Sequence, residues 1–274
     1  MRHLLTFTVL GDELAATLDD ADGDTGLIMV SGGGQTRVGS HRMGERLAKL
    51  LASQGYPCFR YDRRGVGDSS GDDPGFRGSR ADLLGAISAF RASRPGLRRV
   101  IGLGLCDGAT ALALHAGSEM DGLILANPWL VEPAEEMPPP AAIRSHYRQR
   151  LASIEGWRRL ATGALSWRKL VRGLQAIATE QPSSLAAAIA DTLRQTPLPI
   201  ILILAERDAT AIAAKAEWGA SRNALPAPLT ILPIGTDSHT FARPGDDAAL
   251  LGACLDALAR LQAASEASNS ISLR

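Results

Sequence analysis

Short runs of mostly apolar residues recur along the chain, bounded by residues that favour turns. A run of this kind is typical of a strand that is buried on both faces of a sheet. Ahead of these runs, Leu4–Leu10 and Glu13–Leu18 predict two antiparallel strands that turn at Gly11. The later strands are predicted at Leu27–Val30, Pro57–Tyr61, Val100–Leu103, Leu123–Ala126, Ile200–Leu204 and Leu229–Ile234.

Amphipathic stretches with helical spacing lie between most of these runs. Gly55 predicts the end of the first helix, and Ser79, with Asp82 three residues later, predicts a capped start for the second. Strands that alternate with helices predict an α/β fold with a mostly parallel, doubly wound sheet. The apolar stripes are Met43, Leu47, Leu50 and Leu51; Leu83, Leu84, Ile87 and Phe90; and Leu250, Leu251, Cys254, Leu255, Leu258 and Leu261.

The alternation of strands and helices breaks between residues 128 and 197. This interval contains helix-like segments rich in arginine and alanine, and Trp129 stands at its start. A helical insertion between two strands predicts a lid over the carboxyl edge of the sheet, where open α/β sheets bind ligands. We therefore expect a core of residues 1–127 and 198–264, a helical lid at 128–197 with Trp129 at the substrate, and a flexible tail at 265–274. The alternative is a helical subdomain that only stabilises the core.

The composition narrows the function classes. With 29 basic and 29 acidic residues the formal net charge is zero, which argues against a nucleic acid or a membrane surface as partner. Hydrophobic residues make up 45% of the chain, too many for a disordered protein. The 3 cysteines indicate thiols in a reducing compartment rather than a disulfide framework. With neither a signal peptide nor an apolar run of ~20 residues, we expect a soluble cytoplasmic protein.

The strongest chemical signal is the pentapeptide Gly104–Gly108, in which Cys106 is the central residue. It follows one predicted strand and opens a helix expected over Asp107–Ala116, the context of a nucleophile elbow. Such a turn holds the central residue in strained backbone angles, and its flanking glycines avoid collisions. The positive end of the helix dipole favours a thiolate. We expect Cys106 to be a nucleophile; the alternative is a small buried cysteine in a tight turn.

A thiol that performs acyl transfer needs a base. His239 follows the last predicted strand, so it lies at the same sheet edge as Cys106. His41 is the alternative base, because its glycine-rich loop borders that edge too. We expect His239 to carry the proton.

The histidine in turn needs an acid to orient it. Asp208 follows the strand that ends at Leu204, where its carboxylate would hold the second imidazole nitrogen and stabilise the imidazolium. The same carboxylate could also cap the helix that follows. Glu206 is a possible substitute, and Asp237 is a weaker choice because it lies so near His239 in sequence.

An oxyanion hole requires backbone N–H groups aimed where negative charge develops. The N–H of Asp107 is the first expected donor, because this residue directly follows the nucleophile. The N–H of Gly33 is the second, with the neighbouring Gly34 expected to line the substrate site. The Asp107 carboxylate stands beside the thiol, where it would disfavour the thiolate.

Other conspicuous features are expected to be structural. The segment Asp62–Ser69, which is rich in glycine and arginine, predicts a turn near the site. Cys58 lies in a strand and Cys254 on an apolar helical stripe, so both are expected to be buried packing thiols. No cluster of cysteine and histidine has the spacing of metal ligands, and we expect neither a metal nor an organic cofactor.

With these residues in place, the chain resembles the α/β-hydrolase superfamily over nearly its whole length. The resemblance rests, in chain order, on Ser31–Gly34, Asp62–Ser69, Gly104–Gly108, Asp208 and His239. The order nucleophile, acid, histidine is that of the superfamily. It implies an α/β-hydrolase fold with a helical lid.

More narrowly, the chain is similar to the type 1 hydrolases associated with the exosortase A system. The matching stretches are Val30–Gly33, Arg37–Arg42, Phe59–Ser69, Cys106–Asp107, Ala126–Trp129, Leu204–Thr210 and Ser238–Ala242. Those hydrolases are known mainly from gene neighbourhoods for bacterial exopolysaccharide and protein sorting, so the resemblance implies a hydrolase without naming a substrate. The Cys–His–Asp set is also similar to that of dienelactone hydrolases.

Together these features predict a cysteine hydrolase that acts on an ester, thioester or lactone through a Cys106 acyl-enzyme. The substrate is expected to be a small molecule or a carrier-linked acyl group, and transfer to an acceptor other than water is equally compatible with the residues. The alternative from another class is a catalytically silent binding protein that keeps the fold and the pocket.

Overall fold

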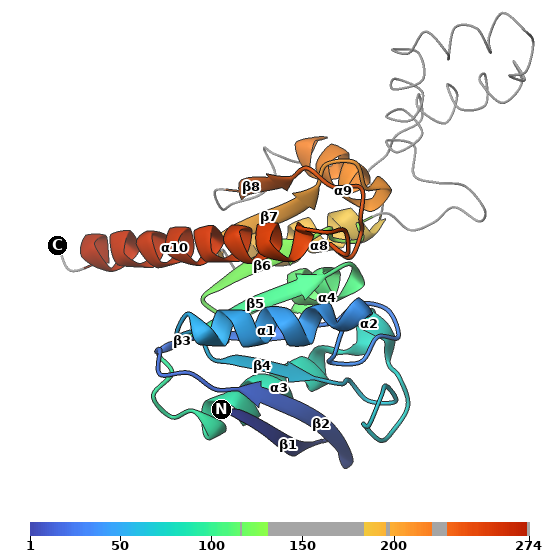
Figure 1. The fold of residues 1–274 in the computed structure, drawn as a ribbon, viewed down its shortest axis with the longest axis vertical. Coiled ribbons are helices and arrows are strands. Elements are labelled where there is room, and N and C mark those ends of the chain that lie inside the picture. Colours follow the sequence, from blue (N-terminus) through green and yellow to red (C-terminus); the bar gives the residue numbers. More distant parts are fainter. Residues whose placement is uncertain (116, 131–183, 196–197, 221–228, 273–274) are drawn as a thin grey trace, which may run out of the picture.

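The computed structural model describes residues 1–115, 117–130, 184–195, 198–220 and 229–272. Their centre is a sheet in the order β1-β2-β4-β3-β5-β6-β7-β8 (Figure 1). The strands are β1 (Arg2–Val9), β2 (Asp12–Asp19), β3 (Thr25–Val30), β4 (Cys58–Tyr61), β5 (Arg99–Leu105), β6 (Gly122–Ala126), β7 (Ile200–Ala205) and β8 (Leu229–Ile234). Neighbouring strands from β4 to β8 pair in parallel, and β2 pairs antiparallel with both β1 and β4. The mostly parallel α/β sheet is confirmed.

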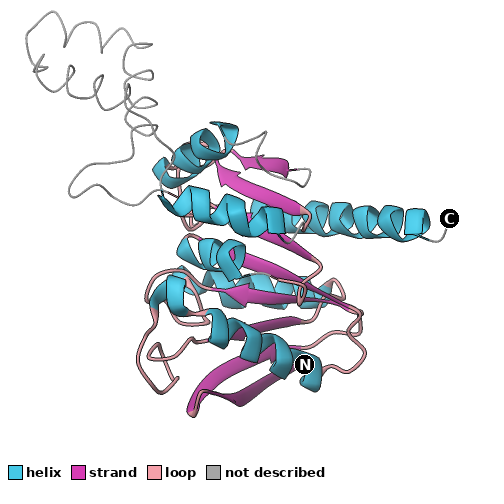
Figure 2. Cartoon of the chain, turned by 180° about the vertical axis from the view of Figure 1, so that it is seen from behind, coloured by secondary structure: helices cyan, strands magenta, loops and turns pink. Residues whose placement is uncertain are grey.

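Helices cover both faces of this sheet. On one face lie α1 (Met43–Ser53), which follows the short helix η1 (Ser40–Arg42), and α10 (Asp246–Ser272) (Figure 1). The opposite face, seen in Figure 2, carries α3 (Arg80–Ser93), α4 (Asp107–His115) and α8 (Ser184–Gln195). The other helices among the described residues are α2 (Gly75–Gly78), which contacts α4, and α9 (Ala209–Ala220), which follows β7.

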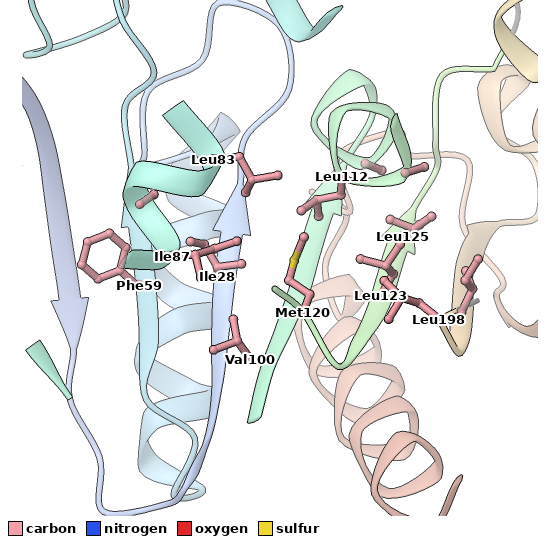
Figure 3. Close-up of a cluster of buried hydrophobic side chains, with 14 of the residues drawn as sticks. Ile28, Phe59, Leu83, Ile87, Val100, Leu112, Met120, Leu123, Leu125 and Leu198 are labelled. Carbon is pink, nitrogen blue, oxygen red and sulfur yellow. The ribbon is translucent and has the colours of Figure 1, made fainter. Parts of the chain in front are cut away.

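The strands bury both faces because their side chains alternate between two hydrophobic clusters. In β6, Leu123 and Leu125 belong to the cluster beneath α3, α4 and α8, whereas Ile124 and Ala126 belong to the cluster beneath α1 and α10. Figure 3 shows the first cluster, in which Leu123 and Leu125 lie close to Leu112 of α4. Two-sided burial explains why the parallel strands are continuous apolar runs in the sequence.

The expected lid, 128–197, lies mostly outside the described residues. Its described end, helix α8, packs against α4 and contributes Leu185, Ile189 and Leu193 to the first hydrophobic cluster. The hydrophobic core therefore includes residues before the expected boundary at 198.

Two local expectations differ from the structure. Ser79 precedes α3, but its hydroxyl donates to the carbonyl oxygen of Phe76, and no side-chain cap forms. Asp82 is fully buried and accepts hydrogen bonds from Arg64, because an ion pair satisfies a buried carboxylate better than a capping amide alone. The polar tail expected to be flexible from Ser265 instead continues as helix α10 to Ser272, because residues that extend an existing helix need no new nucleation.

Candidate functional site

Cys106 lies in a sharp turn between β5 and α4, and its backbone is strained. Its φ is +58°, which is uncommon for any residue other than glycine. Hydrogen bonds hold both backbone polar groups of Cys106, its N–H and its carbonyl oxygen. The Cys106 N–H donates to the Ala126 carbonyl oxygen at 3.0 Å, and the Cys106 carbonyl accepts from the N–H groups of Thr110 at 3.2 Å and Trp129 at 3.3 Å. The strain is therefore imposed by hydrogen bonds to the next strand and to the helix.

The glycines that flank the turn are required by close packing. A Cβ atom on Gly104 would stand 2.6 Å from the Cα of Ala109, and one on Gly108 would stand 2.5 Å from the carbonyl oxygen of Val30. Both distances are far below a normal van der Waals contact. The expected role of these glycines in avoiding collisions is confirmed.

His239 lies on the loop after β8 and pairs with Asp208. Its Nδ1 lies 3.0 Å from Oδ2 of Asp208, the first choice for the acid. The same Oδ2 accepts the Ala211 N–H at 2.9 Å, so Asp208 also caps α9, as expected. A carboxylate that is itself held by the helix gives the imidazole a fixed orientation.

The alternative acids and base lie elsewhere. Glu206 is exposed, and Asp237 pairs with Arg243 at 3.0 Å between Oδ1 and Nε. His41 is an exposed residue of η1. Of the candidate bases and acids, the structure thus brings His239 and Asp208 together.

The pKa of His239 is raised to about 10. The hydrogen bond to Asp208 is the largest cause, a hydrogen bond to Cys106 is the second, and burial opposes both. Because Nδ1 faces Asp208, the other ring nitrogen, Nε2, remains for the thiol. Asp208 and Cys106 thus favour the imidazolium form of His239, whose positive charge stabilises a thiolate.

Asn127, which the sequence analysis did not single out, connects the His239 loop to the sheet. This fully buried residue donates from Nδ2 to the His239 carbonyl oxygen at 2.7 Å and accepts the Ala205 N–H on Oδ1 at 2.8 Å. Its φ is +42°, in the left-handed region that asparagine tolerates better than most residues. The available signal was a polar amide between a buried strand and a proline, at the edge that carries Cys106.

The His239 loop is held from its other end as well. The Thr236 hydroxyl donates to Oδ2 of Asp246 at 2.8 Å, and both side chains are buried. The Ser238 N–H donates to the Thr236 hydroxyl at 3.1 Å. The loop that presents the imidazole is therefore tied to the start of α10.

The two N–H groups expected to form the oxyanion hole lie close to the elbow, but they differ in their hydrogen-bond partners. The Asp107 N–H stands in the first turn of α4, beside the nucleophile. The Gly33 N–H, in contrast, donates to the Asp107 carboxylate. In the structure, a carboxylate therefore occupies the Gly33 donor that the sequence predicts for the oxyanion. Gly34 is exposed at the same loop.

Trp129, expected to lie at the substrate, contacts the elbow, because its N–H donates to the Cys106 carbonyl oxygen. Its carbonyl oxygen accepts the Thr110 hydroxyl at 2.6 Å, and its partly buried side chain packs against the first hydrophobic cluster. On the other side of the sheet a mostly apolar cavity of about 30 Å³ reaches the strand end at Leu105 and the buried Phe241. Apolar surface thus adjoins the strained turn on both sides.

The turn Asp62–Ser69 and the two other cysteines have the structural roles expected of them. Asp62 accepts hydrogen bonds from the Arg37 side chain and from the N–H of Asp68, which closes the turn. Cys58 and Cys254 are buried, and burial raises the pKa of Cys254 to about 12. Because both thiols are buried, neither is expected to react as a nucleophile.

Two further features, a metal site and a membrane-spanning helix, are absent from the described residues. These residues include no group of three or more acidic, histidine or cysteine side chains that could hold a metal ion. None of their helices is long and apolar enough to cross a membrane.

Comparison with known proteins identifies the fold and the family of the chain. Solved structures share the fold at low sequence identity. The esterase Pf2001 of Pyrococcus furiosus is 14% identical, with 95% of this chain and 91% of that chain covered and a TM-score of 0.64. The alpha/beta hydrolase GrgF from Penicillium sp. sh18 is 20% identical, with 96% and 99% covered and a TM-score of 0.64.

A third structure, XC6422 from Xanthomonas campestris, is described as an α/β serine hydrolase without a lid. It is 16% identical, with 94% of each chain covered and a TM-score of 0.60. No curated protein matches the sequence. The model of the alpha/beta hydrolase family matches residues 27–251, which include the elbow, Asp208 and His239. The chain belongs to the alpha/beta hydrolase family.

Proposed function

We propose that the protein is a cysteine hydrolase that cleaves a carboxylic ester, thioester or lactone. The observation that carries the proposal is the strained Cys106 at the elbow, together with His239, whose pKa is raised through Asp208 and Cys106 and whose Nδ1 is held by Asp208. Strain of this kind persists only where surrounding structure maintains it, and it is concentrated at functional sites. A small packing thiol would require neither the strain nor the paired imidazole.

The proposed reaction begins with the thiolate of Cys106 and the imidazolium of His239. Sγ attacks the carbonyl carbon and forms the C–S bond, and the carbonyl oxygen takes up negative charge beside the Asp107 N–H. When the tetrahedral intermediate collapses, the bond to the leaving group breaks. Nε2 of His239 gives its proton to that group, and the acyl chain remains on Cys106.

Water releases the acyl-enzyme. The now neutral Nε2 takes a proton from water, whose oxygen attacks the thioester carbon, and the C–S bond breaks to give the acid and the thiolate. Asp208 holds Nδ1 throughout, so the ring keeps one orientation in both half-reactions. An acceptor alcohol, amine or thiol in place of water would give acyl transfer by the same steps.

Three finer points belong to the same proposal. The substrate is a small molecule or an acyl group on a carrier. We place the protein in the cytoplasm, where Cys106 would stay reduced. The matching stretches named above also support membership of the type 1 exosortase A system-associated hydrolases, which leaves the acyl and leaving groups open.

Alkylation of Cys106 tests the proposal without a known substrate. Iodoacetamide labelling would be followed against pH by peptide mass mapping, in the wild type and in His239→Ala. We expect Cys106 to be alkylated faster in the wild type than in the variant, because the paired imidazole favours the thiolate. The buried Cys58 and Cys254 are internal controls, which should stay unlabelled in the folded protein.

Either outcome decides the function class. A reactive thiol that depends on His239 supports the hydrolase, and turnover of activated esters should then be lost in Cys106→Ala. A Cys106 that reacts like a free thiol in both proteins, together with no ester turnover, would favour the binding protein that keeps only the fold.

A further inference from the structure

The Asp107 carboxylate lies against the glycine loop that faces the nucleophile. Its Oδ1 accepts the Gly33 N–H, and a Cβ on Gly32 would stand 2.6 Å from the same oxygen and 3.0 Å from the Cβ of Cys106. The loop therefore packs directly on the elbow, and the carboxylate is placed between them. Only a glycine at position 32 leaves room for this arrangement.

The carboxylate has few partners besides this amide. Within the described part of the chain, the Gly33 N–H is the one hydrogen-bond donor to the Asp107 side chain. Arg63 adds a positive field at Asp107, but its Nε and Nη2 already donate to Asp73 at 2.6 and 2.9 Å. The described residues thus offer Asp107 no second strong donor that would draw it from the loop.

This arrangement has a consequence for any carbonyl substrate. The donor expected to stabilise the oxyanion is already occupied by a negative charge, and two anions cannot share one N–H. The carboxylate has to move before charge can develop on the carbonyl oxygen. A hydrogen bond to a charged acceptor is about twice as strong as one to a neutral acceptor. The carbonyl oxygen of an uncharged acyl group is therefore too weak an acceptor to displace the Asp107 carboxylate from the Gly33 N–H.

We propose that Asp107 selects acyl groups that carry an ammonium group on the carbon next to the scissile carbonyl. This inference rests on the hydrolase function proposed above. A carbonyl oxygen that enters beside Gly33 brings the substituent of its α carbon close to the carboxylate. An ammonium group there pairs with Asp107 as a full charge, and the Gly33 N–H is released to the oxyanion. The substrate class is therefore an α-aminoacyl ester or thioester.

A pair of matched esters tests the selection. The p-nitrophenyl esters of alanine and propionic acid differ at the amino group, and Cys106→Ala provides the background rate for each. We expect the ratio of kcat/KM for the alanine ester to that for the propionate ester to fall about tenfold or more in Asp107→Asn, which removes the charge and keeps the size. In Asp107→Ala, turnover of the propionate ester should rise as well, because the Gly33 N–H is freed while the backbone N–H at position 107 remains.

The controls separate the possible failures. Glu206→Gln removes an exposed carboxylate that follows β7 and should leave the ratio unchanged. Turnover with the same ratio in the wild type and both Asp107 variants would overturn the selection and leave the hydrolase function intact. Absence of turnover above the Cys106→Ala background for both esters, in all these proteins, would overturn both proposals. Circular dichroism of each variant confirms that it is folded.

Discussion

The side-chain amide of Asn127 donates to the carbonyl oxygen of His239 at 2.7 Å, so a residue at the end of one strand fixes the loop after another. Its Oδ1 accepts the Ala205 N–H at 2.8 Å, at the end of β7. One buried side chain therefore connects the ends of β6 and β7 with the loop that follows β8. The end of β6 bonds to the elbow, Asp208 follows β7, and His239 follows β8.

Replacing Asn127 should disturb both the position of the imidazole and the stability of the fold. In Asn127→Asp the acceptor for the Ala205 N–H is kept, but the donor to the His239 carbonyl is lost. We expect alkylation of Cys106 to slow and ester turnover to fall about tenfold, because a displaced base loses its alignment. Asn127→Ala should also lower the free energy of unfolding by about 1–3 kcal/mol, because a buried N–H is left unsatisfied. Alkylation like the wild type in Asn127→Asp would show that the contact does not position the base.

Asp208 has two roles that one substitution can separate. In Asp208→Asn the side-chain oxygen can still cap α9 through the Ala211 N–H, but the negative charge beside the imidazole is gone. We expect kcat to fall roughly tenfold or more. The free energy of unfolding at neutral pH should fall because the charge beside the imidazolium is lost, whereas the cap of α9 is kept. Glu206→Gln, which changes the other carboxylate after β7, should retain activity. Equal losses of kcat in the two variants would contradict the assignment of Asp208.

Regular patterns in the sequence were sufficient to predict the sheet, the elbow and the partners of the base. Two-sided burial makes strands such as Leu123–Ala126 continuous apolar runs, and parallel strands bring their carboxyl ends to one edge. That geometry alone predicts that Cys106, Asp208 and His239 converge. In each case the sequence signal is local, and the parallel strand order determines that the residues lie near one another.

The contacts that the sequence did not predict are long-range choices between polar partners. Asp82 is placed correctly for a capping box, but it pairs with Arg64, which is distant in the chain. The Gly33 N–H was expected to be free, but the Asp107 side chain reaches it. Which donor a carboxylate selects depends on distances that only the folded chain defines.

The close packing at the elbow predicts a strong effect of a single methyl group. In Gly104→Ala the new Cβ would stand 2.6 Å from the Cα of Ala109, and backbone cannot move aside as a flexible side chain can. We expect the free energy of unfolding to fall by about 1–3 kcal/mol and alkylation of Cys106 to slow. Gly96→Ala is the matched control, because a Cβ there meets no atom within 4 Å. Denaturant unfolding of both variants measures the difference, and equal stability would contradict the packing argument.

The raised pKa of His239 predicts how stability depends on pH. Its pKa in the folded protein is about 10, chiefly through the bond to Asp208, against an ordinary value of 6.5. Because the folded value lies above the unfolded one, the folded state holds its proton more tightly. The resulting stabilisation is complete below about pH 6.5 and is lost as the pH rises through 10. Denaturant unfolding at pH 6, 8 and 10 should therefore show a decline in the wild type that is smaller in His239→Gln, since the other titrating groups are common to both. Asp208→Asn removes the largest cause and should also flatten the decline. Parallel curves for the three proteins would show that His239 has no raised pKa in the fold.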